Sequence, residues 1–214
     1  MATVTRLFDH HDEALSAVSE LEAAGVSSTD ISIVSNNASN WHAGHSHPDR
    51  DPGRLGDRNG DGDNDVAEGA GKGAATGGAL GAGAGVLAGL GMLAIPGLGP
   101  VVAAGWLAST AVGAAVGAAA GGATGGLLGA LKEAGHSDDE ANIYAESVRR
   151  GGTLVSVRCP DTDQSRVEAI LNGRRGFDAS TRGSFYRETG WTGFDPAAAP
   201  YTVDQIDEER ARYR

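Results

Sequence analysis

The sequence predicts an α+β protein: a split ferredoxin-like domain made of two β-α-β units, an inserted Gly/Ala-rich helical hairpin, and an extended C-terminal tail. Three observations lead to this prediction. Two segments repeat one strand-helix-strand pattern, the chain between them carries no charged residue from Gly73 to Leu131, and aromatic residues gather after residue 182. The 214 residues therefore divide into a first β-α-β half (1–36), an acidic, histidine-containing loop (37–68), a glycine-zipper helical hairpin (69–132), a helix with the second β-α-β half (133–182), and an aromatic docking tail with a short terminal helix (183–214).

The first half is predicted as strand, helix and strand. Residues 3–8 alternate apolar and polar side chains, which is typical of a half-buried strand. Leu15, Val18 and Leu21 then recur at helical spacing, and residues 31–35 indicate a second strand. A unit with two short strands cannot bury a core alone, so we expect it to share a sheet with the second half.

The second half repeats the pattern after an additional helix. Residues 137–140 match a capping box, which predicts a helix that runs to Arg150. Residues 153–159 alternate as a strand, a helix follows, and residues 177–181 are predicted as a short last strand. The two units together predict a four-stranded antiparallel sheet with two helices on one face.

Glycine recurs at every fourth position in both arms of the predicted hairpin. Prolines and glycines at residues 95–100 predict the turn between the arms. Helices with glycine at this spacing can approach each other closely, so both rows indicate helix-helix contact. The first glycine row is Gly73, Gly77, Gly81, Gly85 and Gly89, and the second glycine row is Gly113, Gly117, Gly121, Gly125 and Gly129.

The surroundings of this hairpin have two interpretations. Strongly apolar residues crowd toward the turn, which favours a hairpin that dips into one leaflet of a membrane. The alternative is a hairpin buried in the core of a soluble homo-oligomer. Self-assembly is expected in both cases, and membrane lipid is the expected partner in the first. The candidate membrane tip comprises Leu93, Ile95, Leu98 and Trp106.

The acidic loop contains one calcium-loop pattern. Residues 57–68 follow the spacing D-x-[DN]-x-[DN]-G-x5-E, which places oxygen ligands at alternate positions of a tight turn. A solvated acidic linker is the alternative interpretation. If the loop binds Ca²⁺, the candidate metal ligands are Asp57, Asn59, Asp61, Asp63, Asp65 and Glu68.

Charge and cysteine content exclude several classes of protein. A net charge of −11 argues against a nucleic-acid binder, which needs clustered Lys and Arg. The single Cys159 forms no internal disulfide and is typical of a reducing compartment. The N-terminus has no apolar run of the kind that a cleaved secretion signal requires, so a cytoplasmic location is expected. No catalytic triad, phosphate loop or spaced carboxylate pair is recognisable, so we expect no enzyme activity and no catalytic residues.

Several short segments resemble a known family. Residues 4–8, the Ala24-Gly25-Val26 turn, residues 30–34, and Tyr144 with residues 151–155 are similar to bacterial general stress or heat-induced stress proteins with a YflT-type domain. Many of these proteins carry an inserted Gly/Ala hairpin like the one around residues 95–100. The resemblance covers roughly residues 1–36 and 66–182. It implies stress-linked expression and membrane association, and it supplies no catalytic residues.

The leading hypothesis is therefore a non-enzymatic, stress-associated structural protein. It self-assembles through the glycine-zipper hairpin and associates with the cytoplasmic face of a membrane. The alternatives are a calcium-responsive binding or regulatory module and a soluble homo-oligomer with the hairpin in its core.

Overall fold

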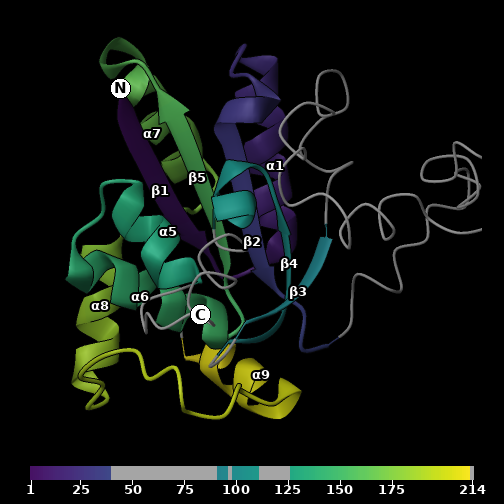
Figure 1. Ribbon diagram of the computed structural model, residues 1–214, viewed down its shortest axis with the longest axis vertical. Helices are drawn as coiled ribbons and strands as arrows, with labels where there is room; N and C mark the ends of the chain where they lie inside the picture. Colours follow the sequence, from purple (N-terminus) through teal and green to yellow (C-terminus); the bar gives the residue numbers. More distant parts are fainter. Residues whose placement is uncertain (40–90, 96–97, 111–125, 213–214) are drawn as a thin grey trace, which may run out of the picture. The chain divides into compact units, whose positions relative to one another are not determined.

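The computed structural model describes residues 1–39, 91–95, 98–110 and 126–212 (Figure 1). These residues form an α+β fold around one antiparallel sheet, and they belong to a single structural unit that excludes residues 40–83. The strand order is β1-β5-β2-β4-β3, and every neighbouring pair is antiparallel. The strands are β1 (Ala2–Phe8), β2 (Ile31–Asn36), β3 (Gly91–Ile95), β4 (Gly99–Ala104) and β5 (Thr153–Cys159).

Helices cover both faces of this sheet (Figure 1). Side chains alternate across β5, so that Val155 and Val157 face one core and Leu154 faces the other. The first core contains α1 (His11–Ala23) and α7 (Gln164–Gly173). The second contains α5 (Leu127–Glu133), α6 (Asp138–Arg149) and α8 (Ala179–Glu188). The described residues also include the 3-10 turns Ser28–Asp30 and Asp161–Asp163, helical residues 106–110 after β4, and the C-terminal helix α9 (Val203–Ala211).

Local sequence signals correctly predicted the central part of this fold. The strand-helix-strand pattern of the first half is confirmed as β1, α1 and β2. The capping box is also confirmed, because the Ser137 backbone N–H donates to Glu140 Oε2 at 2.9 Å and the Glu140 N–H donates to Ser137 Oγ at 3.3 Å. The strand predicted over residues 153–159 is β5, and it lies between β1 and β2 as a shared sheet requires.

The last predicted strand is wrong. Phe177 makes an isolated antiparallel bridge with Leu7, and α8 begins two residues later. The Asp178 side chain accepts a hydrogen bond from the Thr181 backbone N–H at 2.7 Å, so the chain is capped as a helix where a strand would need that N–H for pairing. The boundary expected at residue 182 consequently falls inside α8. The expectation of helices on only one face of the sheet is wrong as well, because α5, α6 and α8 cover the other face.

The predicted helical hairpin is wrong at its turn. Residues on both sides of the turn form β3 and β4, which pair antiparallel and extend the sheet beyond β2. Val101 and Val102 are fully buried, and β-branched side chains of this kind pack well on a pleated sheet. Tertiary pairing with β2 therefore decides the conformation of a segment whose apolar run is compatible with either helix or strand.

Candidate functional site

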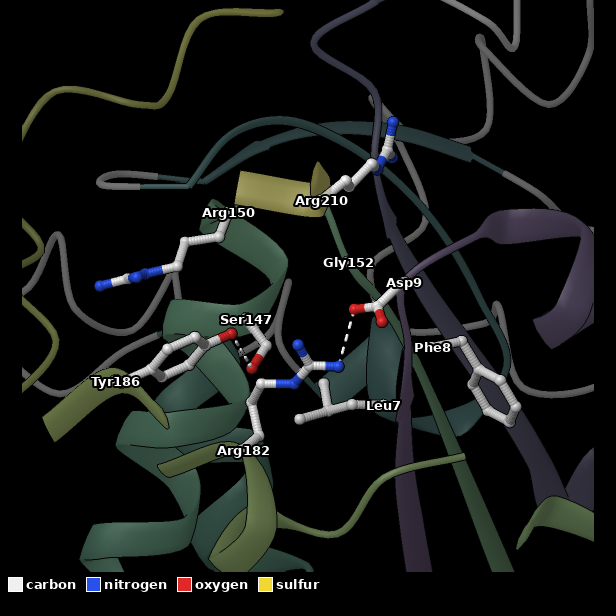
Figure 2. Close-up of a pocket in the computed structure, with 9 residues that line it drawn as sticks. All are labelled: Leu7, Phe8, Asp9, Ser147, Arg150, Gly152, Arg182, Tyr186 and Arg210. Carbon is white, nitrogen blue, oxygen red and sulfur yellow. Dashed lines mark hydrogen bonds and ion pairs between the residues drawn. The ribbon is translucent and has the colours of Figure 1, made fainter. Parts of the chain in front are cut away.

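A small cleft lies at the carboxyl end of α6, where the chain turns through Gly151 and Gly152 into β5 (Figure 2). The end of β1, helix α8 and helix α9 complete its walls. Three arginines from three different helical regions contribute to it. The lining residues are Leu7, Phe8, Asp9, Ser147, Arg150, Gly152, Arg182, Tyr186 and Arg210.

Buried ion pairs fix the end of α6. The Glu146 side chain is fully buried and accepts hydrogen bonds from Arg149 Nε at 2.9 Å, Arg149 Nη2 at 2.8 Å and Arg150 Nε at 2.7 Å. Arg150 Nη1 donates to Glu209 Oε1 of α9 at 2.5 Å. Burial alone lowers the pKa of Arg150, but the hydrogen bonds to the two carboxylates outweigh it and hold the pKa above its ordinary value. Arg150 is therefore a permanent cation between two acids.

The other two arginines of the cleft are also paired. Arg182, only 2% exposed, donates from Nη2 to Asp9 Oδ1 at 2.7 Å. Arg210 donates from Nη2 to the Gly151 carbonyl at 2.9 Å, and its Nη1 lies 3.7 Å from Asp207. Figure 2 shows the Arg182 guanidinium directed at Asp9, whereas the Arg150 guanidinium is turned away toward Tyr186.

This charge arrangement argues against an anion-binding site. Each arginine of the cleft has a carboxylate within 4 Å, so an incoming anion would have to displace an existing partner. Asp9 itself lines the cleft and would repel the anion. The cleft is better described as the anchorage of the C-terminal segment.

The hydroxyl groups in the cleft are engaged in hydrogen bonds. Tyr186 Oη donates to Ser147 Oγ at 2.9 Å, and Ser147 Oγ donates to the Ile143 carbonyl at 2.8 Å. The Arg150 guanidinium lies 4.2 Å from the centre of the Tyr186 ring. A nucleophilic serine needs an adjacent base, and the Ser147 hydrogen bonds described here run to a phenol and a backbone carbonyl. This geometry favours a structural role.

The C-terminal segment packs against the folded domain as a strap, which we define as residues 189–212. Trp191 and Phe194 pack against the second core. The Tyr201 ring lies below Arg149, with 5.1 Å between the guanidinium carbon and the ring centre. Thr202 and Gln205 form a capping box that starts α9, the short terminal helix expected within residues 183–214. On α9, Ile206 and Glu209 are the buried side chains.

The β3–β4 pair lies between the two glycine rows in the sequence. Gly91, two residues after the first row, pairs with Ala103, which belongs to the segment that leads to the second row. Trp106 then anchors this second segment. Its indole Nε1 donates to the Asp30 carbonyl at 3.2 Å, and the Arg158 guanidinium lies 3.7 Å from the ring centre.

The candidate membrane tip lies within this part of the fold. Leu93 and Ile95 belong to β3, and Leu98 is 1% exposed in the second core. Trp106 is partly buried against the sheet. In the structure, Leu98 and Trp106 therefore pack against other parts of the protein.

The other predicted site residues have different positions. Gly129 lies in α5, and the other glycines of both rows lie outside the described residues. The candidate calcium ligands at residues 57–68 also lie outside them. In the described part of the chain, no group of three or more His, Cys, Asp or Glu side chains is arranged to hold a metal ion, and no helix there is long and apolar enough to cross a membrane.

Sequence reasoning missed His136, which joins α5, α6 and β1. Its Nε2 lies 2.8 Å from Thr5 Oγ1, and its ring packs edge-on against Tyr144 at 5.2 Å between centres. Burial lowers the pKa of His136, while nearby Glu140 partly offsets this effect. No sequence signal identified it, because a histidine beside a capping box usually faces solvent. Cys159 is a buried core residue, and burial raises the pKa of its thiol.

No known protein family, curated protein or solved structure matches the chain.

Proposed function

We propose that this chain is a non-enzymatic, stress-associated structural protein that self-assembles through its two glycine rows and associates with the cytoplasmic face of a membrane. The observation that supports it best is the register of β3 and β4. This register pairs Gly91, two residues after the last glycine of the first row, with Ala103, ten residues before the first glycine of the second row.

The register reduces the entropic cost of pairing the rows. Gly91 and Ala103 are partners across two antiparallel strands, which lie about 4.7–4.9 Å apart. Gly89 precedes Gly91 by two residues, and Gly113 follows Ala103 by ten. Two segments that leave one sheet from paired strands close a shorter loop before they touch. In this proposal, the sheet connects the two rows at one end.

The glycines themselves indicate what the rows contact. An internal helical glycine costs roughly 1 kcal/mol relative to alanine, so the nine row glycines other than Gly129, which lies in α5 behind the non-helical Gly126, would sacrifice on the order of 10 kcal/mol of helix propensity. Close contact between helices offsets this cost, because a row without side chains lets two backbones approach. A second copy of the chain supplies such a partner.

The described cleft supports the non-enzymatic part of the proposal. Its serine and tyrosine hydroxyls donate to other protein groups, and its arginines are paired with carboxylates. These groups fix the strap to α6. A reacting centre would instead present a nucleophile next to a base.

We further infer a split ferredoxin-like origin for the sheet. The Phe177 bridge, β1, β5 and β2 follow one another in an antiparallel order, with the last strand reduced to the single Leu7–Phe177 pair.

The resemblance to YflT-type general stress proteins supports the stress-associated role, and the apolar residues Leu80, Val86 and Leu87 beside the first row support membrane association.

Substitution within the rows tests the self-assembly. The double variant Gly81→Leu/Gly117→Leu places one bulky side chain in each row, and the matched control Ala79→Leu/Ala115→Leu places the same side chains two residues away. Light scattering after gel filtration should give an oligomer for the wild type and the control and a smaller species for the row variant. An unchanged oligomer in the row variant would refute assembly through the rows.

Liposome flotation tests the membrane component. Purified full-length protein is mixed with vesicles that contain anionic lipid and is centrifuged through a density gradient. We expect the protein to float with the vesicles. Protein that stays at the bottom as a large species would show that the rows pack against protein, and membrane association would then be withdrawn.

A further inference from the structure

We propose that the strap is a releasable clamp: it holds the β3–β4 turn against the carboxyl end of α6, and its release weakens assembly through the glycine rows. This inference rests on the proposed function and adds a regulatory element to it.

The first step is the contact between the strap and the turn of the β3–β4 pair. Gly99 opens β4 with a positive φ of 82°, and a Cβ built there would lie 2.8 Å from Cβ of Pro200. The strap therefore passes so close to this turn that only glycine fits. The neighbouring Leu98 is buried in the second core, which also receives Trp191 and Phe194 of the strap. The turn and the strap therefore pack against the same hydrophobic core.

The β3–β4 pair needs this support because it lies at the end of the sheet. Within the described residues, β3 pairs with β4 alone, whereas β4 also pairs with β2. The opposite end of the sheet is protected differently, since Phe177 bridges to Leu7 of β1. A terminal strand with one paired neighbour exchanges and frays more easily than a central one.

The second step is the anchorage of the strap at its far end. A side chain at Gly151 would overlap Ile206 of α9, so the absence of a side chain at this glycine lets α9 pack against it. Glu209 accepts a hydrogen bond from Arg150, and Arg210 donates to the Gly151 carbonyl. Between the two ends, Tyr201 lies below Arg149 and Arg150. The strap is therefore attached at the turn, at the arginine pair and at Gly151.

The third step is that this attachment is weak enough to release. Trp191 Nε1 and Arg210 Nε are two of the three buried side-chain atoms in the described residues that lack a hydrogen-bond partner, and both belong to the strap. An unsatisfied buried donor regains a partner in water when the segment detaches. Within α9, Ile206 is the one buried apolar side chain, so few apolar contacts oppose detachment of this helix.

The last step connects the clamp to the glycine rows. The antiparallel register places the Ile95–Gly99 pair at the clamped end and the Gly91–Ala103 pair at the other end. The first row ends two residues before Gly91, and the second row begins ten residues after Ala103. Loss of the clamp would let the terminal pair fray from its turn and would loosen the sheet connection between the two rows.

The test is a matched pair of variants on α9. Ile206→Asp removes the buried contact with Gly151, and Val203→Asp places the same charge on a side chain that is 41% exposed on the same helix. Hydrogen exchange is measured on β3–β4, on α9 and on the central strands β1 and β5. Ile206→Asp should accelerate exchange in α9 and in β3–β4 by at least about tenfold and leave β1 and β5 unchanged, while Val203→Asp should resemble the wild type.

Two outcomes overturn the proposal. Fast exchange in α9 with unchanged protection in β3–β4 would show that the strap does not clamp the turn. If Ile206→Asp also unfolds β1 and β5, the milder Ile206→Ala replaces it, and equal acceleration in all strands of that variant would again contradict a local clamp.

Assembly is measured on the same samples. We expect the protein concentration at half-assembly to rise roughly tenfold in Ile206→Asp and to stay unchanged in Val203→Asp. A released strap with unchanged assembly would refute the regulatory role. If wild-type protein does not assemble, the proposed function fails, whereas the exchange result still reports on the clamp.

Discussion

The fully buried carboxylate of Glu146 gives the sharpest prediction about stability. It accepts three hydrogen bonds from Arg149 and Arg150 at 2.7–2.9 Å. Glu146→Ala leaves the Arg150 guanidinium, 8% exposed, with Glu209 as its remaining carboxylate partner at this site. Breaking a buried ion pair from one side costs about 3–5 kcal/mol, because the remaining charge stays buried. Glu146→Gln keeps an acceptor for one guanidinium and should cost less, about 1–3 kcal/mol.

Urea unfolding followed by circular dichroism measures both changes. The control is Glu188→Ala, an exposed residue at the end of α8, which should change the free energy of unfolding by less than about 0.5 kcal/mol. A loss of less than about 1 kcal/mol in Glu146→Ala would refute the assignment of a buried charge cluster at this site.

Three further predictions concern other parts of the chain. Because burial lowers the pKa of His136, the unfolded chain binds the proton at a higher pH than the folded chain does, so the protein loses stability as the pH falls below the ordinary histidine pKa of about 6.5. The urea midpoints at pH 7.5 and pH 5.5 should therefore differ more in wild type than in His136→Gln. Equal differences would contradict a buried neutral imidazole. Arg175 has a φ of 63°, and its ion pair with Glu13 is exposed, so Arg175→Gly should raise the free energy of unfolding by about 0.5–1 kcal/mol, whereas a loss would exclude backbone strain there. If residues 57–68 form a calcium loop, isothermal titration should detect one bound Ca²⁺ that is lost in Asp61→Ala, and the absence of heat in wild type would leave the acidic linker as the interpretation.

The sequence predicted the parts of the fold that local signals determine. The alternation of apolar and polar residues correctly predicted that β1 and β5 are strands, and the Ser137 capping box correctly predicted the start of α6. These signals depend on residues within one turn or one strand, so they are readable without knowledge of the rest of the chain.

The β3–β4 pair could not be predicted in the same way. Its apolar residues have no decisive period, and glycine spacing on both sides favoured helices. Pairing of β4 with β2, which lies far away in the sequence, determines the strand conformation. The last predicted strand failed for a local reason, because Asp178 caps α8.

The cleft escaped prediction because distant segments create its burial. Glu146, Arg149 and Arg150 look like an ordinary solvated helix face in the sequence. Glu209, which pairs with Arg150 in the structure, lies 59 residues further along the chain. These charges form a buried cluster only when the strap is folded against α6. Leu98 likewise becomes buried only in the folded protein, and its burial separates it from the expected membrane tip.

Light scattering of the purified full-length protein across a range of concentrations tests the central claim most directly. If the β3–β4 pair presents two glycine rows for self-assembly, the molar mass should correspond to several copies and should fall toward one copy on dilution. The mass of a single chain at every concentration would contradict self-assembly through these rows.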